Sequence, residues 1–384
     1  KWFNTNYHYI VPEIEAGFKP KLTHCQLIKE TDEAIAAGFA VRPVVIGPIT
    51  WLALAKGVDG VDLWSKLSGV VAVYSQLLAQ LAPKAEWIQI DEPILAADLP
   101  AAARRAFVDT YHTLVKAAGQ AKLMLTTYFD AVDDHLDLAL ASGCAGLHID
   151  TTRGGRNLDE VLSKIPTEMA LSLGVVDGRN IWKNDFDKSL ATIAKAKKVL
   201  GNRVQVASSC SLLHTPIDLA FETALDPVIK DWLSFAVQKC EEVVALAALA
   251  EGKGDQAALE ANRKSIASRR NSPLTNNPAV RSRVATVTDE MLHRKSPYSQ
   301  RVQAQKWLNL PLYPTTTIGS FPQTAEIRKN RLDFRKGNIS EAQYKEFLKK
   351  EIAHVVKVQE ELDLDVLVHG ESERNDMVEY FGQQ

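Results

Sequence analysis

The stretch Trp87-Ile88-Gln89-Ile90-Asp91-Glu92-Pro93 decides the fold class. An apolar run of strand length ends in two carboxylates and a proline, which is typical of a buried parallel strand that passes into a loop. Further runs of this kind are Pro43–Ile46, Lys122–Thr126, Gly146–Ile149, Ala170–Gly174 and Val204–Ala207. The amphipathic stretches between them are Val70–Leu81, Ala101–Ala117, Ala131–Ala141, Leu158–Lys164 and Lys188–Leu200. Strand and helix alternating at this pitch predict six parallel βα units.

The residues just past each run favour one of the two parallel architectures. They are polar or small: Gly47-Pro48-Ile49-Thr50, Asp91-Glu92-Pro93, Thr127-Tyr128, Asp150-Thr151, Asp177-Gly178-Arg179-Asn180 and Ser208-Ser209-Cys210. Barrels build their active sites at this end of the strands. A doubly wound nucleotide-binding sheet, the structural rival, would show a glycine-rich turn after its first strand, and the sequence has none. We therefore expect an α/β fold of the (β/α)8 TIM-barrel type.

The pattern changes after Pro216. Pro227–Ala250 is predicted to be one long helix, opened by Asp226 before a proline in its first turn. Residues 251–311 are charged and alanine-rich, with breaks at Pro273, Pro278 and Pro297. A new strand over Pro314–Phe321, a helix over Ser340–Glu361 and an apolar run at Val366–Val368 then predict the first two βα units of a second barrel. The predicted domains are 1–216, a barrel lacking its first unit, 217–311, a helical connector, and 312–384, the start of a catalytic barrel.

Composition excludes several classes of protein. Hydrophobic residues make up 46% and charged residues 24% of the chain, and the net charge is −2, which argues against a nucleic-acid partner. The apolar stretches are too short to span a bilayer. Four scattered cysteines (Cys25, Cys144, Cys210 and Cys240) are typical of a reduced, cytoplasmic protein rather than a disulfide scaffold. Because the first residue is Lys1 and no leader follows, we expect the chain to begin inside a longer protein or to have been processed.

Five segments carry a resemblance to a known family. They are Lys1-Trp2-Phe3-Asn4-Thr5-Asn6-Tyr7-His8-Tyr9, Ile90-Asp91-Glu92-Pro93, Ala207-Ser208-Ser209-Cys210-Ser211-Leu212-Leu213-His214, Thr315-Thr316-Thr317-Ile318-Gly319-Ser320-Phe321-Pro322 and His369 through Phe381. In this order they resemble cobalamin-independent methionine synthases. The resemblance covers essentially the whole chain and implies an internal fragment, with most of the first of two face-to-face barrels and the start of the second.

The resemblance implies methyl transfer from 5-methyltetrahydropteroyltriglutamate to homocysteine, giving methionine, without cobalamin. A thiol is a poor nucleophile at neutral pH, and binding to zinc makes it a thiolate. The family's zinc ligands, a histidine, two cysteines and a glutamate, belong to a part of the second barrel that this chain lacks. No catalytic residue and no metal ligand is therefore expected here, and the missing remainder of the polypeptide is the expected partner.

The resemblance also implies the substrate-binding residues of this chain. Ile318, Gly319 and Ser320 would hold the amino-acid end of homocysteine, because glycine admits close backbone approach and a hydroxyl can meet a carboxylate. Glu371 would pair with the substrate ammonium. Lys1 would contact the anionic glutamate tail of the folate.

Three alternatives stay open at this stage. The chain as it stands could be a catalytically inactive substrate-binding module. An unrelated barrel lyase or aldolase could use Asp91, Glu92 and a lysine, although a structural role for the two carboxylates is favoured. His148, Cys144, Cys210 and His214 could form a metal site, but they lack metal-ligand spacing, and we expect a relic of duplication instead.

Overall fold

The computed structural model describes residues 1–23 and 25–382. The chain divides into two compact units, Lys1–Pro278 and Ala279–Gln384. The predicted third domain, 312–384, falls in the second unit, and its last two residues lie outside the described range. The structure divides the chain at Pro278 into two compact bodies, which is not the same as a division between a barrel and a connector. The predicted boundaries at 216 and 311 therefore stay a proposal.

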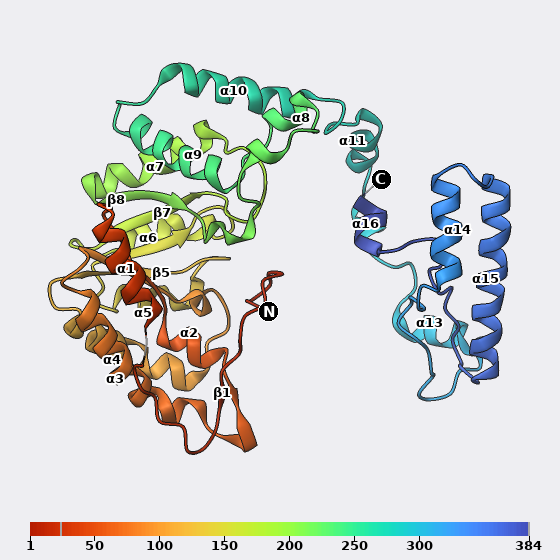
Figure 1. Ribbon diagram of the computed structural model, residues 1–384, viewed down its shortest axis with the longest axis horizontal. Helices are drawn as coiled ribbons and strands as arrows, with labels where there is room; N and C mark the ends of the chain where they lie inside the picture. The colour runs from red at the N-terminus through yellow and green to blue at the C-terminus, as the bar shows by residue number, and fades with distance from the viewer. Residues whose placement is uncertain (24, 383–384) are drawn as a thin grey trace. The chain divides into compact units, whose positions relative to one another are not determined.

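The first unit is built on a six-stranded sheet (Figure 1). Its strands are β2 (Val44–Ile46), β4 (Trp87–Asp91), β5 (Lys122–Thr126), β6 (Gly146–Asp150), β7 (Ala170–Val176) and β8 (Val204–Ser208). They lie side by side in the order of the sequence, and every neighbouring pair is parallel. The six predicted parallel strands are confirmed, and the strand order shows none of the reversal of a doubly wound sheet. The fold is of the α/β, TIM-barrel type.

Helices follow the strands and cover one face of the sheet. They are α2 (Pro48–Ala53), α3 (Leu67–Leu81), α4 (Ala101–Ala117), α5 (Leu136–Leu140), α6 (Leu158–Lys164), α7 (Phe186–Leu200), α9 (Ala236–Ala250) and α10 (Gln256–Asn271). The last of them, α10, packs mainly against α7. Before the sheet come α1 (Gln26–Ala36) and the strand β1 (Glu13–Ile14), which pairs with β3 (Lys56–Gly57). The helix predicted over Ala131–Ala141 is shorter, because Asp133 has a positive φ of 26°, which ordinary helices exclude.

The core of the first unit lies between the sheet and these helices. Strand residues such as Ile90, Leu125, Leu147 and Leu171 are fully buried against them. Side chains alternate along a strand, so their neighbours face the other side of the sheet. His148 is one of these, and it contacts the Ser172 hydroxyl of the adjacent strand at 2.9 Å. The alternation leaves polar groups on the face that the helices do not cover.

The long helix predicted over Pro227–Ala250 is wrong. The structure has a short helix, α8 (Pro227–Asp231), a break at Trp232–Phe235, and then α9. Asp226 caps α8 as predicted, accepting from the N–H groups of Val228 and Ile229. The break arises because Leu233 pairs with Trp182 in an antiparallel bridge, which takes this segment out of helical geometry.

The region after α10 contains short helices, and the first and last of the following three begin at or next to a proline. They are α11 (Pro278–Ala285), α12 (Asp289–Leu292) and α13 (Tyr298–Ala304). The predicted breaks at Pro278 and Pro297 are confirmed, since one opens α11 and the other caps α13. Among the described residues, no helix has the length and apolar character needed to cross a bilayer.

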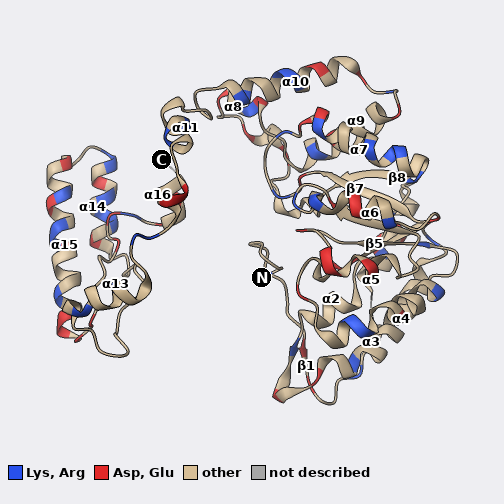
Figure 2. Cartoon of the chain, turned by 180° about the vertical axis from the view of Figure 1, so that it is seen from behind, with Lys and Arg blue, Asp and Glu red and all other residues tan. Residues whose placement is uncertain are grey.

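The second unit is organised around α14 (Ala325–Arg335) and α15 (Glu341–Glu361), with α16 (Met377–Gly382) near its end. Ser340 caps α15 in a capping box with Gln343. Acidic and basic residues are interspersed along α14 and α15 (Figure 2), and some of them form ion pairs along α15. The helix predicted over Ser340–Glu361 is confirmed, because α15 spans Glu341–Glu361 and Ser340 caps it.

The two strands predicted in the second unit form less regular structure than expected. Their segments run parallel, but the pairing consists of one bridge between Ser320 and Gly370. At the other end the Val366 N–H donates to the Thr315 carbonyl at 3.0 Å, and the Asp365 side chain accepts from the backbone N–H and the hydroxyl of Thr315 at 2.7 and 2.9 Å. A two-stranded pairing is marginal without further neighbours, which explains the difference.

Candidate functional site

Glu92, at the end of β4, is fully buried. Its carboxylate accepts hydrogen bonds from the backbone N–H groups of Ile49 and Thr50, at 3.1 and 2.6 Å, and from the Tyr111 hydroxyl at 2.8 Å. Ile49 and Thr50 lie in the first turn of α2, where N–H groups lack helical partners and favour an anion. Gly47 makes the approach possible, because a Cβ there would lie 2.1 Å from Glu92 Cδ. These contacts give Glu92 a structural role.

Asp91 is also held in place by neighbours. It is 9% exposed, and it accepts from the Gln89 amide at 2.8 Å and from the Tyr128 hydroxyl at 3.1 Å. Burial raises the pKa of Asp91 to about 6, although the hydrogen bonds from Gln89 and Tyr128 oppose the rise. Within the described part of the chain, no lysine amine forms an ion pair with Asp91 or Glu92. The lyase or aldolase alternative needs a lysine beside these two carboxylates, and the described residues do not provide one there.

The cysteines proposed for the alternative metal site are buried, and its histidines have other contacts, with the His214 ring 5.6 Å from the Phe129 ring between centroids. Burial raises the pKa of both the Cys210 and the Cys144 thiols to about 12, so they stay protonated at neutral pH. His148 lies between the Ser172 hydroxyl and the Ser209 carbonyl, and burial lowers its pKa to about 4. Among the described residues, no three histidine, cysteine or carboxylate side chains are grouped as metal ligands. The residues present do not fit a zinc ion.

In the second unit, the structure brings together Gly319, Ser320 and Glu371. The Ser320 hydroxyl donates to Glu371 Oε2 at 2.8 Å. A Cβ on Gly319 would lie 3.2 Å from Glu371 Oε1, so the glycine leaves the carboxylate room. Glu371 has a positive φ of 59°, an uncommon conformation for a residue with a side chain, and such strain is concentrated at functional sites. The turn at Gly319 and the carboxylate that follows the next strand segment form one compact polar site.

The charge of Glu371 is stabilised by a neighbour that sequence reasoning missed. Arg374 Nε lies 3.2 Å from Glu371 Oε2. Hydrogen bonding by Arg374 and then Ser320 lowers the pKa of Glu371, so the carboxylate is ionised at neutral pH. The side chain of Glu371 is 21% exposed, and a carboxylate can accept more bonds than these two. The sequence could have indicated this neighbour, because Arg374 lies only three residues beyond Glu371.

The two remaining predicted site residues differ in their surroundings. The Ile318 side chain is fully exposed, so in this chain it offers its backbone rather than a packed side chain. Lys1 is exposed and lies in the first unit. The residue after it, Trp2, is buried against Tyr128 and Cys210, which follow β5 and β8. Trp2 therefore fixes the start of the chain at the carboxyl ends of the strands.

A polar pocket of about 480 Å³ lies close to this N-terminal segment. Its lining includes Asn4, Thr5, Arg179 and His214. The Arg179 guanidinium donates to the side chain and the backbone carbonyl of Asn4, at 2.8 and 3.1 Å. It also lies over the Phe129 ring, 4.8 Å from the centroid. A fixed cation in an open polar pocket suits an anionic group.

Comparison with known protein families gives two matches in chain order. The N-terminal domain of the cobalamin-independent synthases matches residues 1–201, and their catalytic domain matches residues 313–384. The chain belongs to the cobalamin-independent synthase family. The first match covers the strands β2, β4, β5, β6 and β7, with Asp91, Glu92 and Trp2, and ends before β8. The second covers the Ser320–Glu371 site.

Individual relatives of this synthase chain agree with the family match. The 5-methyltetrahydropteroyltriglutamate–homocysteine methyltransferase of Syntrophotalea carbinolica is 47% identical over 386 residues, which span all of this chain and 51% of that protein. The enzyme of the same name from Citrobacter koseri is 49% identical over 388 residues, again all of this chain and 50% of that protein. The chain thus spans about half the length of the curated relatives it matches.

A solved structure also resembles this chain in part. It is the B12-independent methionine synthase of Shewanella sp. W3-18-1 in complex with selenomethionine, which is 12% identical, with a TM-score of 0.45 over 63% of this chain and 70% of that one. The fold described above rests on the strand order and the register of the chain itself.

Proposed function

We propose that the protein to which this chain belongs is a methyltransferase that converts homocysteine to methionine, with 5-methyltetrahydropteroyltriglutamate as the methyl donor. The relatives that match the whole chain carry that activity in their names. The observation that carries the proposal is the compact site of Gly319, Ser320 and Glu371. The role of this site is to hold the amino-acid end of homocysteine while the homocysteine sulfur receives the methyl group.

The chemistry of the site fits an α-amino acid. The ionised Glu371 carboxylate can accept a hydrogen bond from the substrate ammonium, and such charge-assisted bonds are short and strong. Backbone N–H groups around Ile318 and Gly319 offer donors to the substrate carboxylate. The Ser320 hydroxyl donates to Glu371 in this structure and would join them by turning toward the substrate carboxylate when the substrate ammonium donates to Glu371. The two substrate charges would then be held on one turn and one strand end. This fixes the direction in which the sulfur-bearing chain extends.

Lys1 and zinc complete the proposal for the full-length protein. Lys1, positioned by the buried Trp2, would meet the anionic glutamate tail of the folate. Zinc dependence, with the metal held by residues beyond this chain, is what the resemblance implies. It is supported by the protonated Cys210 and Cys144 thiols and by the hydrogen-bonded His148, which do not offer a zinc site of their own. The cytoplasmic location expected from the scattered cysteines stays part of this proposal.

A substrate-pair experiment on the full-length protein tests the role of Glu371. The probes are homocysteine and 4-mercaptobutanoate, which has the same skeleton without the ammonium. If Glu371 binds the ammonium, the parent protein prefers homocysteine, and Glu371→Gln reduces that preference by roughly tenfold or more, mainly through KM. The control is Glu361→Gln, which changes an exposed carboxylate of α15 and should leave the preference unchanged.

The result that would contradict the assignment is equally specific. If Glu371→Gln keeps the parental preference for homocysteine over 4-mercaptobutanoate, Glu371 is a structural carboxylate held for Arg374 and Ser320. A catalytically inactive role of the present chain is tested separately, by assaying methionine formation with the chain alone and with the full-length protein.

A further inference from the structure

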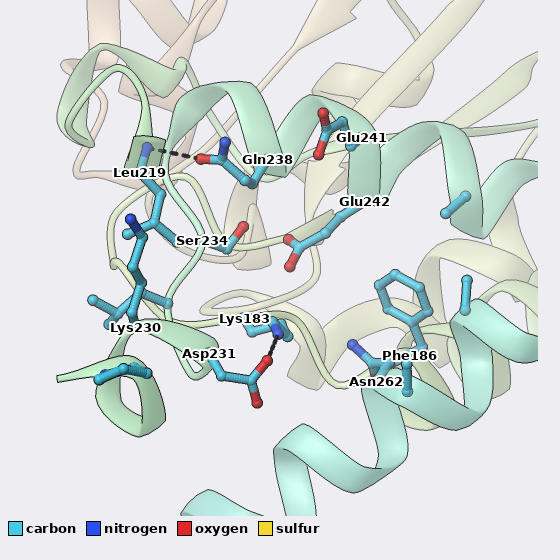
Figure 3. A pocket seen from close by; sticks show the side chains of 15 residues that line it. Lys183, Phe186, Leu219, Lys230, Asp231, Ser234, Gln238, Glu241, Glu242 and Asn262 are labelled. Carbon is cyan, nitrogen blue, oxygen red and sulfur yellow. Dashed lines mark hydrogen bonds and ion pairs between the residues drawn. The ribbon is translucent and has the colours of Figure 1, made fainter. Parts of the chain in front are cut away.

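A second pocket of the first unit lies away from the strand-end residues described above. It has a volume of about 580 Å³ and is bounded by the start of α7, by α8 and by α9 and α10 (Figure 3). Its apolar wall includes Phe186, Leu219, Leu233, Ala245 and Ala261. This volume is typical of sites for small molecules, which combine apolar walls with a few placed polar groups.

Two buried polar groups in this pocket lack hydrogen-bond partners. Glu242 is 7% exposed, and its Oε1 accepts from the Asn184 backbone N–H at 2.9 Å. Its Oε2 has no partner in the described part of the chain, and neither does the hydroxyl of Ser234, which is 1% exposed. The Ser234 hydroxyl is close enough to lower the pKa of Glu242, but the two do not meet in hydrogen-bonding geometry. Buried polar groups are normally paired, so both call for an explanation.

Apart from the exposed Glu241, the other polar groups of the lining are already engaged. Lys183 forms an ion pair with Asp231 at 2.9 Å. The Gln238 side chain accepts from the Leu219 N–H at 3.1 Å, and the Lys230 amine donates to a backbone carbonyl. Figure 3 shows Glu242 and Ser234 directed into the same space, above the Lys183–Asp231 pair. The buried groups that the pocket offers a ligand are therefore one carboxylate oxygen and one hydroxyl.

The buried carboxylate determines the kind of ligand. Burial raises the pKa of Glu242, which shows that water does not solvate its charge well. The nearby buried cation, Lys239, donates to the Trp182 carbonyl at 3.1 Å. A ligand ammonium would donate to both Glu242 Oε2 and Ser234 Oγ, and an apolar body would lie against Phe186. An anionic ligand would meet the Glu242 charge and be repelled.

We propose that this pocket binds a small primary ammonium compound with an apolar body. Both a simple amine and an amphipathic amino acid have an ammonium group and an apolar body. The amino acid also has a carboxylate, which would need a cation in the pocket. Lys230 is the lining group that could supply it. The pocket shares no residue with the site proposed for homocysteine, and we assign it a role in regulating or stabilising the protein rather than in its reaction.

Calorimetric titration of the chain with four matched probes tests the proposal. Phenethylammonium carries the expected groups, 2-phenylethanol lacks the charge, 3-phenylpropionate reverses it, and phenylalanine adds a carboxylate. We expect saturable binding of phenethylammonium in the millimolar range, as its size allows, and binding of 2-phenylethanol that is at least roughly tenfold weaker. Phenylalanine binding as well as phenethylammonium would identify amino acids as the source. Weaker binding of phenylalanine would identify simple amines.

Variants place the binding in this pocket. Glu242→Gln should weaken phenethylammonium binding by at least roughly tenfold, whereas Glu241→Gln, a neighbouring exposed carboxylate of the same lining, should change it by less than about twofold. If Glu242→Gln does not fold, Ala261→Phe fills the pocket from an exposed position of α10 and should abolish binding. Equal binding of 2-phenylethanol, unchanged binding in both pocket variants, or no saturable binding of phenethylammonium would overturn the proposal.

Discussion

Replacing Glu92 with glutamine should change how the stability of the first unit depends on pH. Burial raises the pKa of Glu92 from its ordinary 4.5 to about 7, although hydrogen bonds from Thr50, Tyr111 and Ile49 oppose the rise. The folded state therefore binds a proton more tightly than the unfolded state does. The stability that results is fully present below about pH 4.5 and is lost as the pH rises through about 7.

The magnitude follows from the two pKa values. A difference between 4.5 and about 7 corresponds to about 3 kcal/mol, at roughly 1.4 kcal/mol for each pH unit. The parent chain should lose about that much unfolding free energy between pH 4.5 and pH 8 through Glu92 alone. Glu92→Gln cannot titrate and should lack this component. It should also be less stable at every pH, because its amide presents a donor where the Thr50 N–H donates.

Urea unfolding of both proteins at several pH values, followed by circular dichroism, measures the effect. The quantity of interest is the difference between the two pH profiles, in which the titration of Asp91 and other shared groups cancels. Glu86→Gln, which changes an exposed carboxylate, is the control and should follow the parent. Parallel profiles for the parent and Glu92→Gln would refute the reasoning and show that Glu92 keeps an ordinary pKa.

Two further predictions concern neighbouring features. Gly47→Ala should destabilise the first unit by about 1–3 kcal/mol or more, because the added Cβ would lie 2.1 Å from Glu92 Cδ; a denaturation midpoint equal to the parent's would show that the loop adjusts freely. The chain should hold no tightly bound zinc, because its buried thiols have a raised pKa and zinc binds thiolates. Elemental analysis after dialysis against a weak chelator checks this. One zinc per chain that disappears in Cys210→Ser would contradict it.

The strands and most helices of the first unit could be predicted because local patterns determine them. Apolar runs such as Lys122–Thr126 are strands with those bounds, and Ala101–Ala117 is a helix with those bounds. The break at Trp232–Phe235 could not be predicted in this way. The segment contains no proline or glycine, and its geometry depends on pairing with Trp182, which is about fifty residues away in the sequence.

The candidate site shows the same division between local and distant information. Gly319, Ser320 and Glu371 were found because they lie in recognisable motifs, and the structure places them together. The hydrogen bonds that hold Glu92 come from residues 42 and 43 positions before it and 19 positions after it. No short motif records such long-range partners. Pocket residues such as Glu242 are invisible for a further reason, because the pocket exists only where the predicted helix breaks.

The break at Trp232–Phe235 also joins two loops that follow different strands. Lys183 N–H donates to the Trp232 carbonyl at 2.9 Å, and Ser234 N–H donates to the Ile181 carbonyl at 2.8 Å. The segment after β7 and the corner between α8 and α9 are thus tied by reciprocal backbone bonds. Segments joined in this way open as one cooperative body rather than separately. The amide protons of Lys183 and Ser234 should consequently exchange with solvent at similar rates, as members of one local unfolding unit.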